Sequence, residues 1–359
     1  MSYILRNVNS KFERKAILPP VSVTRYSSTV FLKSDVDFFF QTRIDVNADF
    51  PEICYYNIES AFLTPQFCVF TEDNIPVLDT SIRLSVQGKT KKLSETLETY
   101  NSSRNSASSN KNHCVPGQVI LAASFGGLKV WGHWLVQNLV RVLYAKSIFK
   151  NLKIAIPRSF KGTSYYQSLL YYGVVESDIV FLSRDRNYVF ENLLMLDYLY
   201  RGHSIHPVAV DILKGYSVKD SNKVLHDYPK RVLVKRLGSR KIKNFSQVEM
   251  LLQKFGFLTI SFDNIPFSKQ VDLWKNAEVI ISPTGSDLTN IVFSNDSLKV
   301  GMLTPSYFKD IFFIDLASAF SVKTYEIVCN TSFDKIASIH DDFEVDLESV
   351  QDMIAQMNL

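Results

Sequence analysis

Short apolar runs alternate with amphipathic segments along the last two thirds of the chain. The runs are about five residues long and rich in Val, Ile and Leu, which is typical of buried strands, whereas the segments between them repeat their apolar positions at helical spacing. Strands that alternate with helices need crossover connections, and these connections produce a mainly parallel sheet. The pattern therefore predicts an α/β fold. The predicted strands are residues 119–123, 152–156, 179–182, 231–235, 257–261, 279–281, 298–302 and 322–328, and the predicted helices are 133–148, 165–172, 246–255, 268–276 and one that follows Asp346.

This alternation falls into two halves that meet near residue 225, so we expect two domains, residues 1–225 and 226–359. The first hundred residues do not follow this alternation, because prolines interrupt their short apolar runs, whose composition is typical of strands. This pattern predicts a β-rich N-terminal extension. Residues 101–112 consist almost entirely of Asn and Ser and predict a mobile loop. Since open α/β sheets bind ligands at the carboxyl ends of their strands, we expect a site between the two halves.

Composition narrows the class of protein. Of the 359 residues 46% are hydrophobic and 21% are charged, which excludes disorder as the main state. Forty Lys and Arg against thirty-six Asp and Glu give a net charge of only +4, so net charge does not indicate nucleic-acid binding. The four cysteines lack metal-ligand spacing and no signal peptide or membrane-spanning run is visible, so we expect a cytoplasmic protein without a metal site. Peripheral contact with a membrane and homo-oligomerisation are left open.

A turn of small residues follows the predicted strand 279–281. Pro283 to Ser286 end this strand, and a further helix is expected to begin near Asp287. Backbone N–H groups at such a turn and at a helix N-terminus attract anions without any side chain. The same pattern also describes an ordinary connection between a strand and a helix.

Two arginines follow the predicted strand 231–235. Arg236 and Arg240 come where a parallel strand ends, and a pair of guanidinium groups there can hold a diphosphate through bidentate hydrogen bonds. A solvated charged loop is the alternative. A nucleic-acid site is a weaker interpretation, because no aromatic residues are interleaved with the basic ones.

A third group of polar residues lies at the start of the predicted helix 133–148. His133 is followed by Gln137 and Arg141 one and two turns later, roughly on its face. A helix N-terminus disfavours the imidazolium, which would leave His133 neutral and able to accept a proton. A structural histidine bonded to backbone is the alternative. His203 and His206 form an HxxH, but no third ligand is near, so a metal site is not predicted.

These segments together resemble glycosyltransferase family 61 over about residues 115–305. The resemblance departs from the family at two positions, because Thr284 replaces a histidine of the last signature and Gln137 replaces an acidic residue. The residues that carry the resemblance are Gly132, His133, Trp134, Leu135 and Arg141 in the first motif, Arg236, Arg240 and Asn244 in the second, then Gly256 and Phe257, then Phe267, Ser268 and Gln270, and finally Gly285, Leu288, Thr289, Asn290 and Phe293.

The resemblance implies the GT-B architecture, in which two Rossmann-like, doubly wound domains face a cleft, and the final helix is expected to cross back. It also implies an inverting transfer from a nucleotide sugar, often a UDP-sugar, to a saccharide or glycolipid acceptor, with the donor as co-substrate and no cofactor. Without a visible anchor, a bacterial enzyme that builds capsule or lipopolysaccharide at the inner face of the cytoplasmic membrane is expected. A polysaccharide pyruvyltransferase-like enzyme and a non-catalytic nucleotide-sugar-binding subunit are the alternatives.

The resemblance also suggests roles for individual residues. His133 is the expected general base and Asp287 its reserve. Residues 1–225 would serve the acceptor and residues 226–359 the donor. The expected nucleotide-sugar site comprises Arg236, Arg240, Gln270, Thr284, Gly285, Ser286, Leu288, Thr289 and Asn290, and the expected acceptor side comprises Trp131, Gln137 and Arg141.

Overall fold

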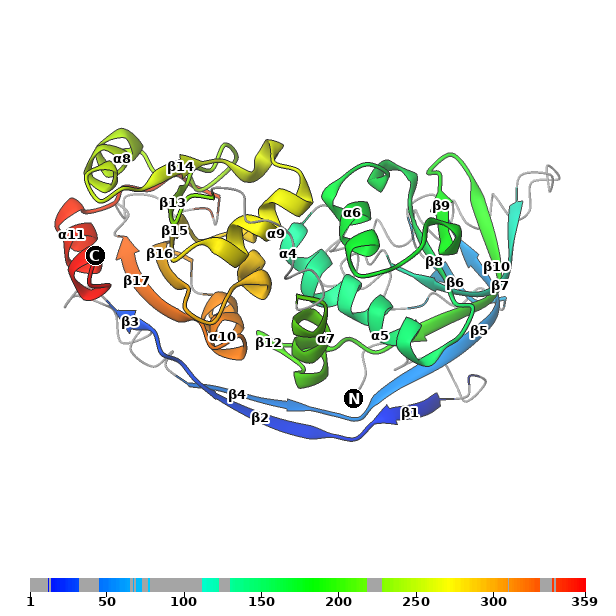
Figure 1. Cartoon of the computed structure of the whole chain (residues 1–359). Helices are drawn as coiled ribbons and strands as arrows, with labels where there is room; N and C mark the ends of the chain where they lie inside the picture. Colours follow the sequence, from blue (N-terminus) through cyan, green and yellow to red (C-terminus); the bar gives the residue numbers. More distant parts are fainter. Residues whose placement is uncertain are drawn as a thin grey trace. The chain divides into compact units, whose positions relative to one another are not determined.

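The computed structural model divides the chain into two compact units (Figure 1), which are described separately. Unit 1 consists of residues 1–21 and 49–199, and unit 2 of residues 22–48 and 200–359. This division falls at residue 200 rather than at the predicted boundary near 225, because the helix after residue 206 packs in unit 2. The structure describes residues 12, 14–31, 45–64, 67, 69–72, 77, 112–122, 130–217, 228–308, 310–329, 338 and 340–359, and residues 101–111 of the predicted mobile loop lie outside these ranges.

Unit 1 is built on a mixed seven-stranded sheet. Its strands follow the order β1-β5-β10-β7-β8-β9, with β6 paired to β5. The pairs from β10 to β9 are parallel, and β5 is antiparallel to its neighbours. The sequence pattern did not identify β5 and β10, because polar residues interrupt their apolar positions. The strands are β1 (Arg14–Leu18), β5 (Ile53–Leu63), β6 (Val69–Phe70), β7 (Asn112–Leu121), β8 (Lys153–Pro157), β9 (Ile179–Leu182) and β10 (Asn187–Leu196).

One continuous helical segment of unit 1 covers residues 131–148, where the sequence predicts a helix over 133–148. Its central turn is π-helical, a wider form that occurs mostly as single turns and often near functional sites. Its parts are α4 (Trp131–His133), η2 (Trp134–Leu139) and α5 (Val140–Ile148), and the other helices of unit 1 are η3 (Arg158–Phe160), α6 (Ser164–Tyr171) and η4 (Glu176–Asp178).

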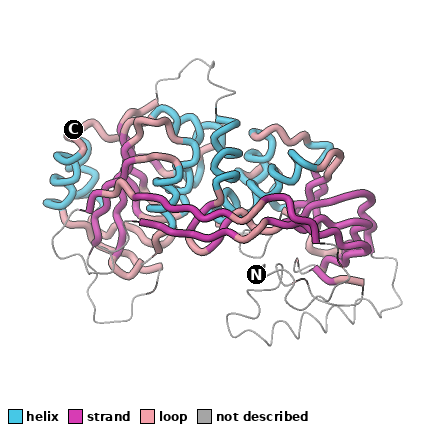
Figure 2. The backbone as a smooth tube through the Cα atoms, turned by 90° about the horizontal axis from the view of Figure 1, so that it is seen from below, coloured by secondary structure: helices cyan, strands magenta, loops and turns pink. Residues whose placement is uncertain are grey.

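Unit 2 contains a six-stranded sheet whose pairs are all parallel, in the order β14-β13-β15-β16-β17-β3. Figure 2 draws the strands in magenta and the helices around them in cyan. The predicted α/β class with parallel sheets is therefore confirmed. The edge strand β3 comes from the N-terminal part of the chain. The strands are β3 (Val30–Phe31), β13 (Arg231–Val234), β14 (Leu258–Ile260), β15 (Val279–Pro283), β16 (Lys299–Pro305) and β17 (Lys323–Cys329), and smaller pairs are formed by β2 (Val21–Tyr26) with β4 (Asp45–Phe50) and by β11 (Tyr200–Arg201) with β12 (Ser204–Ile205).

Helices cover both faces of this parallel sheet (Figure 1). Apolar residues of α8 and α11 form one core with alternate residues of the strands. Gly301 of β16 permits close packing there, because a Cβ would lie 2.6 Å from the Met353 sulfur. α11 contacts β17 and α8, and its expected crossing to the first domain is not confirmed. The helices of unit 2 are α7 (Pro207–Ser217), α8 (Phe245–Gln253), η5 (Phe262–Asn264), α9 (Phe267–Asn276), η6 (Ser286–Phe293), α10 (Phe312–Ala319) and α11 (Leu347–Gln356).

Two helix starts test the predicted caps. Asp346 caps α11 as predicted, since its carboxylate accepts the Ser349 N–H at 3.1 Å. α9 begins at Phe267 after Pro266, one residue before the predicted Ser268 cap. Among the described residues, none of the helices combines the length and apolar character that crossing a membrane requires.

Candidate functional site

The guanidinium of Arg236 lies directly against the backbone of Gly285 in unit 2. The two residues follow the neighbouring parallel strands β13 and β15, so both stand at the carboxyl edge of the sheet. A Cβ at Gly285 would lie 1.4 Å from Arg236 Nη1. The φ of Gly285 is 170°, an ordinary extended value. Glycine is therefore needed here for the close approach of the arginine and not for its backbone conformation.

Arg236 has fewer hydrogen-bond partners than its partly buried guanidinium can use. Its Nε donates to the Ser239 carbonyl at 3.1 Å, and Nη1 lies 3.7 Å from Asp287 Oδ2. Nη1 is buried and has no hydrogen-bond partner among the described residues. A buried N–H without an acceptor is unfavourable, so this atom marks a position where a ligand oxygen would be stabilised.

Arg240 brings a second cation to the same edge. Its guanidinium lies 4.8 Å from the centre of the Phe308 ring, and its Nε is also buried without a hydrogen-bond partner in the described part of the chain. Burial and the neighbouring Arg236 lower the pKa of Arg240 to about 10. The guanidinium still carries its charge at neutral pH. Two like charges with unused donors would be stabilised by a bound anion.

The remaining side chains at this edge follow β15 and β16. Burial raises the pKa of Asp287, and the charge of Arg236 opposes that rise. Burial also raises the pKa of Tyr307 to about 12, against the influence of Arg240, so the phenol is neutral at physiological pH. Its hydroxyl donates to the Asp341 carbonyl. The sequence pattern did not identify Tyr307 and Phe308 as residues of this site, although their position shortly after the predicted strand 298–302 could have indicated it.

Gln270 and Asn290, both predicted to bind the ligand, instead bind each other. The Asn290 amide donates to Gln270 Oε1 at 3.2 Å, and Gln270 Nε2 donates to the Ile265 carbonyl at 2.8 Å. Both side chains are buried, as are Leu288 and Thr289. Gln270 and Asn290 thereby connect α9 to η6, the helix that begins beside the arginines.

The Thr284 hydroxyl does not face the arginines. It donates to the Leu303 carbonyl at 3.0 Å and lies 3.0 Å from Thr304 Oγ1, and the residue is buried just after β15. Thr284, predicted to belong to the nucleotide-sugar site, therefore uses its hydroxyl in bonds within unit 2. The next helix also differs from expectation, because Ser286–Phe293 is a 3-10 helix. Its first N–H groups, at Ser286 and Asp287, lack partners within the helix, as at any helix start.

In unit 1 the predicted acceptor-side residues separate into two groups. Trp131, His133 and Gln137 are partly exposed. Arg141 is buried, and its guanidinium donates to the Leu196 carbonyl at 3.3 Å and the Leu121 carbonyl at 3.5 Å. Arg141 thus joins the carboxyl ends of β10 and β7. Arg141 is thus buried while His133 and Gln137 are partly exposed, and the π-helical turn lies between His133 and Arg141.

Aromatic rings surround the first turn of this helix. Trp131 meets Tyr165 edge-to-face at 5.7 Å, and Tyr165 stacks on Phe160 at 4.3 Å. The Trp134 indole N–H donates to Ser168 Oγ at 2.8 Å, which fastens α6 to the π-helical turn. The partly exposed Trp131 and Tyr165 rings therefore form a rigid apolar face.

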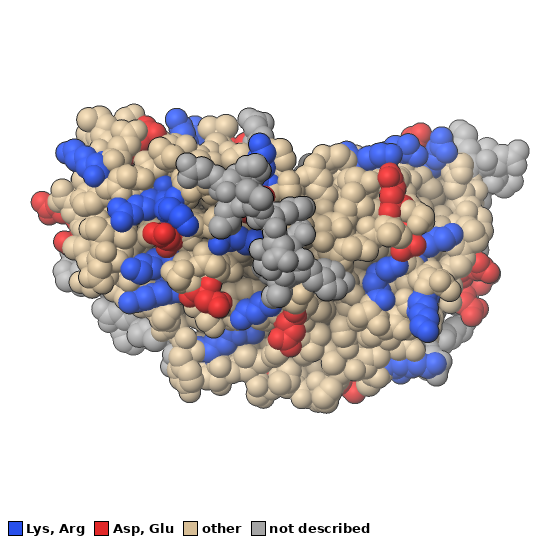
Figure 3. Space-filling view, viewed as in Figure 1, with Lys and Arg blue, Asp and Glu red and all other residues tan. Residues whose placement is uncertain are grey.

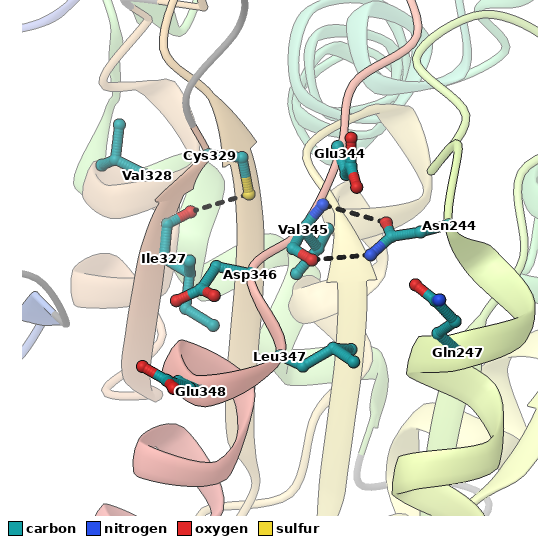
Figure 4. Close-up of a pocket in the computed structure, with 10 residues that line it drawn as sticks. All are labelled: Asn244, Gln247, Ile327, Val328, Cys329, Glu344, Val345, Asp346, Leu347 and Glu348. Atoms are coloured by element: carbon teal, nitrogen blue, oxygen red, sulfur yellow. Dashed lines mark hydrogen bonds between the residues drawn. The ribbon is translucent and has the colours of Figure 1, made fainter.

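Unit 2 also contains a cavity of about 480 Å³ at the end of β17 (Figure 4). Asn244, the last residue of the second family motif, holds its wall by donating to the Val345 carbonyl at 2.8 Å and accepting the Val345 N–H at 3.0 Å. Glu344, Asp346 and Glu348 line the cavity. This acidic lining does not suit an anion, which distinguishes the cavity from the edge that carries the arginines.

Outside the edge that carries the arginines, neither the surface charge on the face drawn in Figure 3 nor a group of metal ligands marks a further site among the described residues. On the face drawn in Figure 3, basic and acidic side chains are interspersed, so charge alone does not mark a binding surface there. Within the described ranges, no three His, Cys, Asp or Glu side chains are grouped so as to hold a metal ion. The features that distinguish a site in unit 2 are the glycine turn and the two partly buried guanidinium groups, each of which has a buried nitrogen without a hydrogen-bond partner in the described part of the chain.

The fold and the geometry of the site define a class of protein: an α/β protein with a cationic site at the carboxyl edge of a parallel sheet. The family model Glycosyltransferase 61 matches residues 131–301, slightly less than half of the chain. The matched segment includes His133, both arginines and the Gly285 turn. Over this segment the chain is similar to that family, which supports a glycosyltransferase. No curated protein matches the chain.

Proposed function

We propose that the chain is a family 61 glycosyltransferase that transfers a sugar from a nucleotide sugar, a UDP-sugar in the first instance, to a saccharide or glycolipid. The observation that carries this proposal is the pair of partly buried guanidinium groups of Arg240 and of Arg236, which lies against Gly285. Each has one buried nitrogen without a hydrogen-bond partner among the described residues. A diphosphate supplies the negative charge and the oxygen acceptors that these groups lack. The family match over residues 131–301 supplies the reaction class.

In the proposed reaction, an acceptor hydroxyl attacks the anomeric carbon and inverts its configuration. The bond from that carbon to the diphosphate breaks, and its electron pair leaves with the diphosphate. Arg236, Arg240 and the N–H groups at the start of η6 neutralise the charge that develops there. His133 accepts the hydroxyl proton, with Asp287 in reserve, and Trp131 and Gln137 contact the acceptor. The donor is a co-substrate, and the proposal includes neither metal nor other cofactor.

The proposal extends to the setting of the enzyme. We assign the chain to the GT-B class, with unit 1 serving the acceptor and unit 2 the donor. We place the reaction in bacterial surface polysaccharide synthesis, at the cytoplasmic side of the membrane. A non-catalytic nucleotide-sugar-binding subunit is the second candidate, because the buried Thr284 hydroxyl leaves the glycine turn without the signature's titratable side chain.

Calorimetric titration with UDP tests the donor site. Arg236→Ala should weaken UDP binding by about 10-fold or more, since a hydrogen bond to a charged group contributes about 1.5–3 kcal/mol. Lys254→Ala, which removes an exposed cation at the end of α8, is the control and should leave the affinity unchanged. Equal affinities of the wild type and Arg236→Ala would contradict the proposed site. Release of UDP from UDP-sugars distinguishes the enzyme from a binding subunit.

A further inference from the structure

His203 lies at the turn of the β11–β12 hairpin, close to the arginine site of unit 2. Its Nδ1 is 2.7 Å from Asp310 Oδ1. Asp310 follows Phe308, the residue whose ring packs under Arg240, by two positions. The Asp310 carboxylate is near enough to Arg240 to raise the pKa of that guanidinium, against the larger effects of burial and Arg236. The imidazole therefore belongs to the same edge of the sheet as the two arginines.

A buried ion pair holds the hairpin in place. Arg25 Nη1 contacts both carboxylate oxygens of Asp315 in α10, at 2.9 and 2.8 Å, and the two side chains are only 9% and 1% exposed. Arg25 Nη2 also donates to the Ile205 carbonyl. Asp315 accepts further hydrogen bonds from the Ser204 side chain and the Ile205 backbone. The strand that follows His203 is therefore anchored to α10.

The partner of His203 is anchored to the same helix. Asp310 Oδ1 accepts the Phe312 N–H at 2.9 Å, a local bond that holds the carboxylate beside the first residue of α10. The Tyr200 ring, at the other end of the hairpin, packs edge-to-face on Phe312 at 5.9 Å. Both members of the His203–Asp310 pair thus have a fixed position relative to α10.

A carboxylate that accepts Nδ1–H fixes the orientation of an imidazole and of its other nitrogen. The His203 side chain is 51% exposed, and Nε2 makes no hydrogen bond to any residue that the structure describes. Nε2 can therefore reach a ligand from solvent. The described charged and titratable groups on the elements around the imidazole include Asp310, Asp315, Arg25, Arg240, Tyr200, Arg201 and His206.

We propose that His203, oriented by Asp310, is the proton donor to the departing diphosphate. This inference rests on the proposed function. When the bond between the anomeric carbon and the diphosphate oxygen breaks, that oxygen keeps the electron pair, and the proton on His203 Nε2 moves to it. The imidazole is left neutral and regains a proton from water after the nucleotide departs. Arg240 stabilises the bound diphosphate, and His203 acts when the bond breaks.

The test measures nucleotide release from a panel of UDP-, GDP- and CMP-sugars at saturating donor, with water or added saccharides as acceptor. His203→Gln should lower the release rate by about 10²-fold or more, as expected for loss of a proton-transfer group, and change UDP affinity only a few-fold. Asp310→Asn should cause a similar loss while the Asn side-chain oxygen still accepts the Phe312 N–H. His113→Gln, which alters an exposed histidine on β7 of unit 1, should leave the rate unchanged.

A charge-retaining variant and the pH profile separate a proton donor from a base. His203→Lys should recover part of the rate, and its activity should persist at a pH where the wild-type rate falls, because lysine keeps its charge across the range in which histidine loses it. A wild-type rate that rises through this range would overturn the inference, as would full activity of His203→Gln.

Failure of this inference differs from failure of the proposed function. If UDP binds and Arg236→Ala abolishes that binding, while His203→Gln releases nucleotide at the wild-type rate, only the role of His203 is wrong. If no nucleotide or nucleotide sugar binds to the wild type, the donor site itself is wrong, and the role of His203 is wrong with it. Circular dichroism of each variant establishes that it is folded.

Discussion

Gly285 and Arg236 show how one absent side chain shapes a site. The guanidinium occupies the space in which any other residue would place its Cβ. As a result, the charge of Arg236 lies over the turn where the N–H groups of Ser286 and Asp287 begin η6. The donor site proposed here depends on this contact more than on any property of the turn's side chains.

Gly285→Ala should weaken nucleotide binding without unfolding the protein. The added methyl group would collide with Arg236 and displace its guanidinium, whereas the extended φ of 170° accommodates alanine without strain. We expect about a 10-fold or greater loss of UDP affinity by calorimetry. Gly238→Ala is a matched control in the loop between the two arginines, where a Cβ would meet no atom within 4 Å. Wild-type affinity of Gly285→Ala would show that the guanidinium does not hold the nucleotide from this position.

Individual residues also show that a residue of a family motif does not have to contact the ligand. Arg141, Gln270, Asn290 and Thr284 all stand in the family motifs, yet their polar atoms bond to backbone or to other buried side chains. Sequence patterns identify such residues but cannot distinguish a group that supports a site from one that touches its ligand. That distinction depends on which way each side chain points.

At the scale of elements, the connection between α9 and η6 positions the start of η6. Gln270→Met keeps the volume of the side chain but removes its hydrogen bonds to Asn290 and to the Ile265 carbonyl. Since each buried polar group left without its partner costs about 1–3 kcal/mol, we expect the free energy of unfolding to fall by about 2–3 kcal/mol in urea titrations. Gln253→Met, on the exposed side of α8, is the control and should change stability by less than about 0.5 kcal/mol. A stability loss no larger than that of the control would contradict this role.

The spacing of apolar residues predicts that a segment is helical better than it predicts whether the helix is an α-, 3-10 or π-helix. Residues 133–148 form the expected helical segment, but its central turn is π-helical and not α-helical. The helix near Asp287 is a 3-10 helix. Apolar spacing reports that a segment is helical, whereas the exact pitch responds to packing against neighbours such as Ser168.

At the scale of the whole molecule, the N-terminal part of the chain completes unit 2. β3 extends the parallel sheet beside β17, and Thr29 Oγ1 lies 2.7 Å from Thr324 Oγ1. Arg25 adds the buried ion pair with Asp315. Residues 22–31 are therefore part of the unit that carries the arginine site, although some two hundred residues separate them from it in sequence.

Arg25→Met should destabilise the protein strongly, because it leaves the Asp315 carboxylate buried without its partner. Breaking a buried ion pair from one side costs about 3–5 kcal/mol, which urea unfolding would measure. Arg14→Met is the matched control, since the Arg14–Glu52 pair is 46% and 39% exposed and should contribute no more than about 1 kcal/mol. Replacing both partners, Arg25→Met with Asp315→Leu, should recover much of the lost stability. Equal effects of the two single variants would refute the special role of Arg25.

The sequence by itself determined the α/β class, most strands of the parallel sheet in unit 2, the Asp346 cap and the placing of Arg236, Arg240 and Gly285 at strand ends. These follow from local rules, because apolar periodicity and cap chemistry act within one element and parallel strands all end at one edge. Only the tertiary structure decided that Thr284 and Arg141 face inward, that His203 meets Asp310, and that β3 joins the second sheet. Those contacts join residues far apart in the chain, and no local pattern encodes the direction in which a side chain finds its partner.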